Sequence, residues 1–556
     1  MSSNKGLGNK ILAQGMILAI ASMLSRVIGL VYRVPLTNII GDTGNDYYGT
    51  AFTIYNIVLI VSSYSLPIAV SKIVSAKMAV NEVENARRSL VGALLFALTT
   101  GTIGMLIIWF GADALANMLK TPLSAPALRV LAPVILIVAL VGVIRGFFQG
   151  LHTMVPSAIS QIVEQIVNAI VSVVAAYYLF NYGLKAGALI GNKDKYAAAY
   201  GAAGGTLGTA AGAGVALIFM LFIFSIYKGV FNKKLRRSRA KKMPVDSYST
   251  VFRILIFTII PILLSTTIYN LFSFTEMFIF KNVTRLQGYD PHQISLWWGI
   301  YAGKISVLTN IPIAIASALS ASFMPAISAS FKKGDKAEVR SLIVLSTRFI
   351  SLLAFPCMVG FFVLAHPFLL MLFHDNSAEA ATILMINCFC VPFYCLSTLS
   401  NGLLQGINKM MEPVKNAAIA LLCHAVFLLF ILEVFNSNIY GGMVAVIFYG
   451  VLMCIFNRVS LYKYTRIIPE FYKTYFLPLI ASILMGVFVF ISYKLIHIIT
   501  ASNPIATIIS IFVGMITYFA LIIKVGAINE KELQRVPKGD LIIRLAYKMR
   551  LFKERD

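Results

Sequence analysis

Apolar runs of about 20 residues recur from one end of this chain to the other, and each can cross a hydrocarbon core roughly 30 Å thick as a helix. Only 12% of the 556 residues are charged, about half the fraction of a typical soluble domain. We therefore predict an all-α polytopic membrane protein. Its fourteen predicted transmembrane helices cover residues 11–34, 47–76, 90–111, 127–150, 154–180, 198–227, 249–280, 294–330, 339–365, 379–405, 412–435, 439–462, 473–497 and 503–524.

Two of these segments, 47–76 and 294–330, are longer than a single straight span needs. Proline removes one helical hydrogen bond and its ring clashes with the preceding turn. Pro67, Pro312 and Pro325 are therefore the predicted sites of kinks or turns in the two long segments.

Two motifs occur once in each half of the chain, in the same order. L-P-I-A-V at 66–70 matches I-P-I-A-I at 311–315, and G-F-F-Q-G at 146–150 matches G-L-L-Q-G at 402–406. This order indicates that a multi-helix unit has been duplicated. Such repeats in membrane proteins typically form two lobes around a central site, with alternating access between them, so a transporter is the leading hypothesis.

The duplication predicts two six-helix lobes, each with an even number of spans, so that both lobes have the same orientation in the membrane. The predicted domains are an N-terminal lobe at 1–228, a basic cytoplasmic linker at 229–248, a C-terminal lobe at 249–462, two extra helices at 463–524 and a basic amphipathic cytoplasmic tail at 525–556. Residues 541–552 of the tail are predicted to form a helix on the inner leaflet. The glycine-rich stretch 201–214 offers a small-residue face for close helix packing.

The formal net charge of +25 is distributed unevenly along the chain. With a cytoplasmic N-terminus and fourteen spans, the basic clusters at 228–242, 332–340, 458–473 and 531–555 all fall on the inner side. This asymmetry follows the positive-inside rule and predicts that both termini are cytoplasmic. The same charge distribution predicts contact with anionic inner-leaflet lipids, and no nucleic-acid partner.

Charged side chains within the apolar segments are the candidate functional residues, because burying one in a membrane costs at least ~2.5–3.5 kcal/mol. Arg26 and Arg33 are seven residues apart, on one face of a helix, and Lys304 belongs to the other lobe. Cations from both lobes would suit a phosphate or diphosphate. As alternatives, Arg33 and Lys304 extend to the membrane interface, and Arg26 pairs with Glu164 or Glu276.

Glu164 is either a proton or cation site or the partner of Arg145, and Glu276 has a similar pair of interpretations. No nucleophile–base constellation, nucleotide loop or metal-ligand spacing can be placed, and the six cysteines lie in apolar segments. We therefore expect no enzymatic activity, no cofactor and no ATP-driven pump. An ion gradient or the membrane potential would supply the energy, with the coupling ion unidentified.

Three segments resemble the multidrug/oligosaccharidyl-lipid/polysaccharide (MOP) exporter superfamily: S-R-V-I-G-L-V-Y-R at 25–33, R-G-F-F-Q-G-L-H-T-M-V-P-S-A-I-S-Q-I-V-E-Q at 145–165, and L-L-Q-G-I-N-K at 403–409. Within this superfamily, the chain is most similar to the lipid II flippases of bacterial cell-wall synthesis, on the branch shared with the stage V sporulation B proteins. The resemblance covers nearly the whole chain.

The resemblance implies a V-shaped cavity between two lobes, a cationic site for the diphosphate of an undecaprenyl-linked sugar, and a groove near the last two helices for the lipid tail. Arg26, Arg33 and Lys304 would hold the diphosphate. Lys304 stands where the family has an arginine, and the family's arginine of the second span has no counterpart in 54–60. The predicted gating or coupling residues are Asp46, Arg145, Glu164 and Glu276.

The expected function is a flippase of the bacterial plasma membrane that carries lipid II from the inner to the outer leaflet for peptidoglycan biosynthesis, and so supports the cell wall and cell shape. The nearest alternative carries another lipid-linked polysaccharide unit. A cation-coupled drug exporter would need an acidic, aromatic pocket. A membrane scaffold would instead recruit cell-wall synthesis enzymes through the basic loops.

Overall fold

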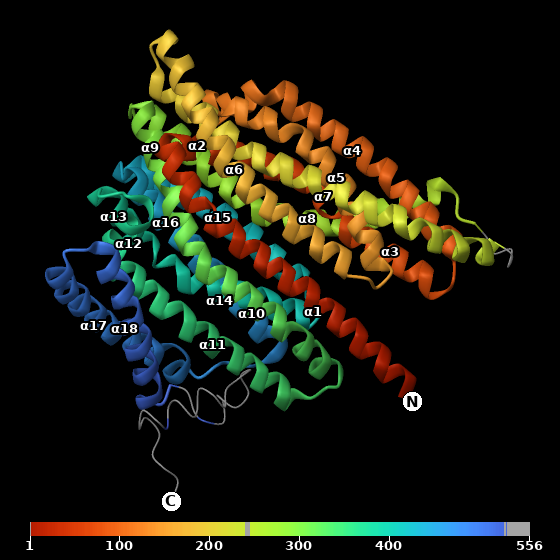
Figure 1. Ribbon diagram of the computed structural model, residues 1–556. Helices are drawn as coiled ribbons and strands as arrows, with labels where there is room; N and C mark the ends of the chain where they lie inside the picture. The colour runs from red at the N-terminus through yellow and green to blue at the C-terminus, as the bar shows by residue number, and fades with distance from the viewer. Residues whose placement is uncertain (1, 240–244, 528–529, 531–546, 548–556) are drawn as a thin grey trace, which may run out of the picture. The chain divides into compact units, whose positions relative to one another are not determined.

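The structure is a computed structural model that describes residues 2–239, 245–527, 530 and 547 (Figure 1). The described residues form helices joined by short turns and contain no β-strand, which confirms the all-α prediction. They divide into two compact units, Met1–Gly303 and Lys304–Asp556. The predicted boundaries of the lobes and the linker stay a prediction.

The N-terminal unit begins with two helices that proline separates. Pro35 has no N–H to donate to the carbonyl of Val31, and α1 ends at that residue. The elements of this unit are α1 (Ser2–Val31), α2 (Arg33–Leu59), the π-helix η1 (Ile60–Tyr64), α3 (Leu66–Ala79), α4 (Val83–Met118), the 3-10 helix η2 (Pro122–Ser124), α5 (Ala125–Gly150), α6 (Val155–Ile190), α7 (Lys193–Arg239), α8 (Tyr248–Leu286), α9 (Pro291–Ile300) and the π-helix η3 (Tyr301–Ile305), which crosses into the second unit.

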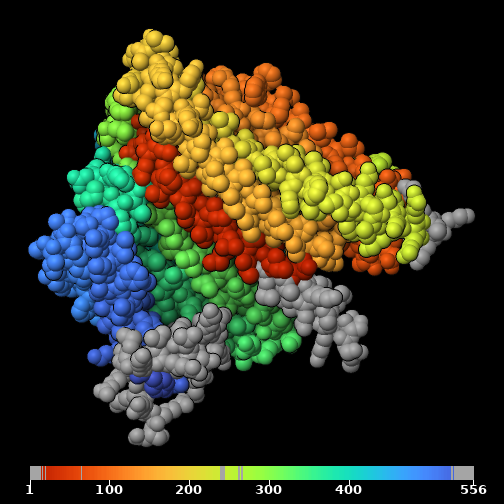
Figure 2. All heavy atoms as spheres, in the orientation of Figure 1, coloured from red at the N-terminus to blue at the C-terminus, as the bar shows by residue number. Residues whose placement is uncertain are grey.

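The C-terminal unit continues with helices of similar length and ends in two that pack against each other, α17 and α18, seen in blue in Figure 2. Its elements are α10 (Ser306–Lys332), α11 (Lys336–Val363), α12 (Ala365–Phe373), α13 (Ala378–Asn387), α14 (Cys390–Gly406), α15 (Met411–Phe435), α16 (Asn438–Thr465), the π-helix η4 (Tyr472–Phe476), α17 (Leu477–Thr500) and α18 (Asn503–Lys524).

Among the described residues, twelve helical segments are long and apolar enough to span a membrane. Two shorter apolar helices, Ile20–Val31 and Tyr248–Ile260, lie within the first and seventh predicted spans. The protein is therefore a multi-pass membrane protein, and the count of fourteen spans stays a prediction. The predicted tail helix at 541–552 lies outside the described residues except for Tyr547.

The two long segments are interrupted in similar ways. In the first, α2 passes into π-helical η1, and Pro67 occupies the first turn of α3, where a missing N–H breaks no helical bond. In the second, α10 continues through Pro312 and Pro325, and the interruption lies earlier, in π-helical η3. The prediction from Pro67 therefore identified the region of the first interruption. The second interruption lies before Pro312 and Pro325, so the prediction from these two prolines missed it.

Both copies of the G-x-x-Q-G motif pack against another helix of their own unit, Gly146 against Pro67 of the first repeated motif and Gly402 against Ser320, beyond the matching motif at 311–315. A Cβ added at Gly146 of α5 would lie 2.6 Å from the carbonyl oxygen of Pro67 on α3. A Cβ added at Gly402 of α14 would lie 2.0 Å from Oγ of Ser320 on α10. Both positions therefore need glycine, because a neighbouring helix occupies the space of a side chain.

The glycine-rich face of α7 packs along α6, and the two helices run side by side in Figure 1. A Cβ added at Gly204 would lie 2.5 Å from the carbonyl oxygen of Ala175, and one at Gly208 would lie 2.0 Å from Oγ of Ser172. These approaches confirm the predicted small-residue face. Helix α7 also continues to Arg239, so the first half of the predicted linker at 229–248 is helical.

Candidate functional site: a buried ion pair and its polar network

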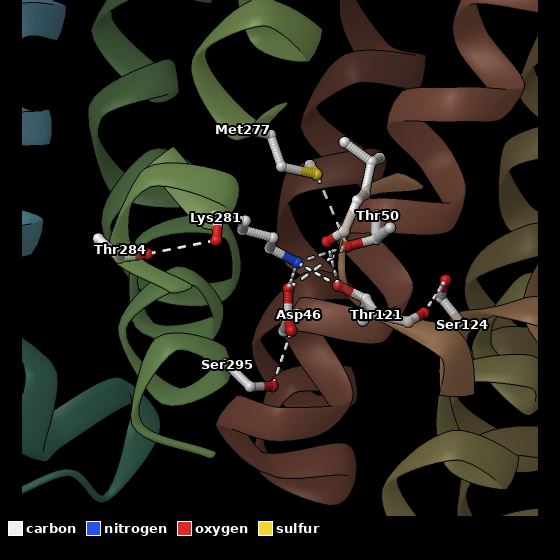
Figure 3. A network of polar contacts seen from close by, with 9 residues as sticks. Asp46, Thr50, Thr121, Ser124, Met277, Lys281, Thr284 and Ser295 are labelled. Carbon is white, nitrogen blue, oxygen red and sulfur yellow. Dashed lines mark hydrogen bonds and ion pairs between the residues drawn. The ribbon is translucent and has the colours of Figure 1, made fainter. Parts of the chain in front are cut away.

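Four segments of the N-terminal unit place polar side chains around the ammonium of Lys281 (Figure 3). Asp46 and Thr50 are four residues apart and therefore share a face of α2. Lys281 lies near the end of α8, Ser295 lies on α9, and Thr121 directly precedes η2. These residues come together only when α2, α8 and α9 pack around the end of α4.

Lys281 uses its three N–H donors in this network. Its Nζ forms an ion pair with Oδ1 of Asp46 and donates hydrogen bonds to Oγ1 of Thr50 (2.9 Å) and Oγ1 of Thr121 (2.7 Å). The other carboxylate oxygen of Asp46 accepts a hydrogen bond of 2.7 Å from Oγ of Ser295. The Lys281 and Asp46 side chains are only 1% and 2% exposed, so solvent screens their charges little.

Two glycines allow α9 and η3 to approach α2 closely enough for this network to form. A Cβ at Gly299 would lie 1.8 Å from the carbonyl oxygen of Asp42, and one at Gly303 would lie 2.3 Å from Cγ of Asn45. Within α2, Gly41 has a φ of 68°, which bends the helix just before Asp46. The amide of Asn45 donates a 2.9 Å hydrogen bond to the carbonyl of Gly41 across this bend.

A second ion pair joins α5 to α6 in the same unit. Nη2 of Arg145 lies 2.7 Å from Oε2 of Glu164, and Nε donates a 2.7 Å hydrogen bond to Oγ of Ser160. Glu164 and Ser160 are four residues apart on α6, so the planar guanidinium contacts both from one side. Of the two interpretations of Glu164, the structure therefore has the ion pair with Arg145.

A third ion pair lies in the C-terminal unit. Nζ of Lys304 is 2.6 Å from Oδ2 of Asp375, and their side chains are 8% and 11% exposed. Asp375 follows α12, and its other oxygen accepts a 2.8 Å hydrogen bond from the backbone N–H of Ser377. Burial opposes ionisation of Asp375, but the hydrogen bonds from Lys304 and Ser377 outweigh it and lower the pKa of this carboxyl.

The remaining predicted site residues lie in the N-terminal unit. Arg26 is exposed on α1, and Figure 2 shows the described part of α1 at the surface in red. Arg33 begins α2; its guanidinium carbon lies 4.5 Å from the centre of the Tyr48 ring, and its Nη1 is buried with no hydrogen-bond partner. Glu276 is 2% exposed, hydrogen-bonds Tyr301 and leaves Oε1 without a partner.

Reasoning from sequence named Arg145 as a possible partner of Glu164 but missed the partners of Asp46 and Lys304, which are Lys281 and Asp375. Lys281 stands one residue beyond the predicted span 249–280, and the neighbouring residues F-I-F and N-V are mostly apolar. That apolar context signals a lysine that needs a partner. Asp375 lies in a polar loop, H-D-N-S, and carried no comparable signal.

Comparison with known families identifies the chain. The family model described as polysaccharide biosynthesis protein matches residues 11–331, more than half of the sequence, and the MatE model matches residues 303–430. The chain belongs to the polysaccharide biosynthesis protein family.

Two proteins of Bacillus subtilis (strain 168) resemble this chain along most of its length. The lipid II flippase MurJ is 25% identical over 525 residues, which cover 88% of this chain and 91% of the flippase. Stage V sporulation protein B is 25% identical over 537 residues, which cover 95% of this chain and 98% of that protein.

Solved structures share the fold of this chain. The lipid II flippase MurJ in an inward closed conformation has a TM-score of 0.63 at 15% identity, covering 91% of this chain and 98% of that one. An inward-facing multidrug resistance MATE family transporter has a TM-score of 0.62 at 14% identity, covering 81% and 98%. With the family match, these findings assign the chain to the MOP superfamily, on the branch of the lipid II flippases and stage V sporulation protein B.

Proposed function

We propose that this protein is a flippase that carries an undecaprenyl-diphosphate-linked peptidoglycan precursor, lipid II, from the inner to the outer leaflet of the bacterial plasma membrane. Arg33 is the structural observation that carries the proposal. Its guanidinium lies over Tyr48 in an apolar helix, and its Nη1 has no hydrogen-bond partner. The Arg33 side chain is half-buried, and its Nη2 donates a 3.4 Å hydrogen bond to the carbonyl of Ala302. The unused Nη1 donor suits the oxygens of a diphosphate, with which a guanidinium forms charge-assisted hydrogen bonds.

In this proposal, Arg26 and Arg33 bind the diphosphate from the N-terminal unit. Their separation of seven residues supports a shared face, because the N–H of Tyr32 still bonds to the carbonyl of Ile28 where α1 ends. Lys304 contributes from the C-terminal unit once Asp375 releases it, so the diphosphate would compete with this carboxylate for the ammonium.

The ion pairs of Asp46 and of Arg145 with Glu164 are the proposed gating elements. The first joins α2 to α8, which are distant in sequence, and the second joins the consecutive helices α5 and α6. An exchange of partners would change how those helices pack. Transport needs no catalytic residue. An inside-negative membrane potential favours outward movement of an anionic headgroup by about 2.3 kcal/mol per charge per 100 mV.

The direct test is translocation of lipid II in proteoliposomes that contain the purified protein. We expect flipping by the wild type and its loss in Arg26→Ala/Arg33→Ala, because the diphosphate then has no guanidinium to replace its water. The matched control is Arg87→Ala, which removes a half-exposed arginine that pairs with Glu84. No flipping by a folded wild type would overturn lipid II as the cargo.

A second cargo deserves the same assay, because the matching family model is described as polysaccharide biosynthesis protein and stage V sporulation protein B aligns over 95% of this chain. This alternative keeps the mechanism and replaces lipid II with another lipid-linked polysaccharide unit. Flipping of that lipid, and not of lipid II, with the same sensitivity to Arg26→Ala/Arg33→Ala, would support it.

A further inference from the structure

A cavity of about 460 Å³ opens at one end of the N-terminal unit, and the buried pair of Asp46 and Lys281 forms part of its lining. Here α4 and α8 end, and α7 and α9 begin. Because α4 runs the length of the unit, this end is opposite the one at which Lys77 forms ion pairs with Glu82 and Asp246. All residues that line the cavity belong to the N-terminal unit.

The cavity has an excess of positive charge. Lys120, Lys195 and Arg285 line it and are exposed, and none of them forms an ion pair within the described part of the chain. Lys281 lies at its base and is neutralised by Asp46, the one carboxylate among the lining residues. Three cations are therefore left uncompensated around one hollow, where their fields add.

The other lining residues are polar (Tyr47, Asn117, Thr121, His292 and Ser295) or apolar (Pro122, Leu123, Pro291 and Ile294). The hydroxyls of Thr121 and Ser295 already donate to the carbonyl of Leu119 and to Asp46. The cavity also contains the first turn of α9, whose dipole presents partial positive charge. Asp290 caps this turn through a 3.2 Å hydrogen bond from the N–H of His292 and is not among the lining residues. Uncompensated cations beside the N-terminal turn of a helix favour an anion with several oxygens.

Lys120, which lines the cavity, has an unusual backbone conformation. Its φ is 54°, in the left-handed region that usually holds glycine or asparagine after a helix. For a residue with a long side chain this conformation costs about 1–2 kcal/mol. Glycine would avoid that cost, and lysine at this position adds a cation to the lining.

We propose that this cavity is a second anion site, which binds a phosphate or diphosphate group. It is separate from the site that we assign to Arg26, Arg33 and Lys304, because none of these residues lines it. The planar guanidinium of Arg285 would contact two phosphate oxygens with two parallel hydrogen bonds. The ammonium groups of Lys120 and Lys195 would bind the same phosphate as point charges. The ligand is either a lipid-linked diphosphate headgroup or a free anion.

The test measures how fast N-hydroxysuccinimidyl acetate acylates each lysine of the full chain in lipid nanodiscs, by mass spectrometry. Inorganic diphosphate should slow acylation of Lys120 and Lys195 several-fold. Lys185 and Lys193 are matched controls, because they are exposed in the same region of the chain and do not line the cavity. Potassium chloride at equal ionic strength should leave all four rates unchanged.

The outcomes separate the two ligand sources. If inorganic diphosphate protects Lys120 and Lys195 from acylation, a free anion is sufficient to occupy the cavity. If only undecaprenyl diphosphate in the nanodisc protects them, the ligand is the lipid headgroup. Arg285→Gln should weaken the protection and Arg285→Lys should retain part of it. Equal slowing at Lys185 and Lys193, or no slowing with either ligand, would overturn the proposal.

The same assay distinguishes this site from the transport site. Arg26→Ala/Arg33→Ala should keep full protection of Lys120 and Lys195. Protection in that variant together with lost flipping would support two separate anion sites, whereas loss of protection would mean that the cavity does not bind on its own. Flipping by the wild type without any protection would refute the second site and leave the proposed function unaffected.

Discussion

At the scale of single residues, most charged side chains in apolar surroundings form ion pairs, which offset the free-energy cost of their burial. Asp46 with Lys281, Arg145 with Glu164, and Lys304 with Asp375 all join residues from different helices or loops. In the sequence, Lys304 was interpreted as a phosphate ligand and Asp46 as a gating residue, without their partners, whereas Arg145 and Glu164 were also considered as a pair. A binding role for Lys304 therefore includes the separation of an existing ion pair.

The buried pair in the N-terminal unit gives a test of this view. Asp46→Asn or Lys281→Met should each destabilise the protein by about 3–5 kcal/mol, because each leaves one buried charge without its partner. Asp46→Leu/Lys281→Met should recover much of that loss. Thermal unfolding in detergent measures the stability of all three variants, with Arg87→Ala as the control. An unchanged stability of Lys281→Met would mean that the ion pair does not stabilise the protein.

The pair in the C-terminal unit predicts a dependence on pH. The pKa of Asp375 is lower in the folded protein than its ordinary value of 3.8, so its ion pair contributes stability above that pH. This contribution is lost as the pH falls through the lowered pKa of the folded state. The melting temperature of the wild type should therefore exceed that of Asp375→Asn at neutral pH, and the difference should shrink below about pH 4. A constant difference would exclude the charge as its cause.

At the scale of elements, glycines determine which helices approach each other most closely. The repeated motif brings α5 against α3 and α14 against α10, and the glycine-rich face of α7 meets α6. In each case a side chain would overlap atoms of the neighbouring helix. This explains why the two halves share these short motifs while most of the surrounding apolar sequence differs.

Two glycine-to-alanine substitutions in α7 distinguish the effect of close helix packing on stability from the effect of helix propensity. Gly204→Ala should destabilise by about 1–3 kcal/mol, because its Cβ would meet the backbone of Ala175 at 2.5 Å. Gly214→Ala should be neutral or stabilise by up to about 1 kcal/mol, because no atom lies within 4 Å of its Cβ and alanine favours the helix. Equal effects in thermal unfolding would mean that close packing of α7 on α6 is unimportant.

At the scale of the whole molecule, the basic segments predict the orientation in the membrane. A single cysteine in place of Lys336, at the start of α11, should be protected from a membrane-impermeant thiol reagent in intact cells. A cysteine in place of Lys193, at the start of α7, should react. Replacing the six native cysteines with serine or alanine provides the background. Reaction at position 336 and protection at position 193 would show that the orientation in the membrane is opposite to the predicted one.

What the sequence alone determined was local. Apolar length and composition indicated the helical membrane protein, small residues indicated the face of α7, and the repeated motifs indicated that two halves use the same helix contacts. These properties depend on residues that are near one another in the chain. The partner of Asp46 stands 235 residues away, and only the packing of α2, α8 and α9 brings Lys281 to it. The cavity that this pair helps to line likewise needs the ends of four helices, so its cluster of cations follows from the tertiary structure and not from any segment of the sequence.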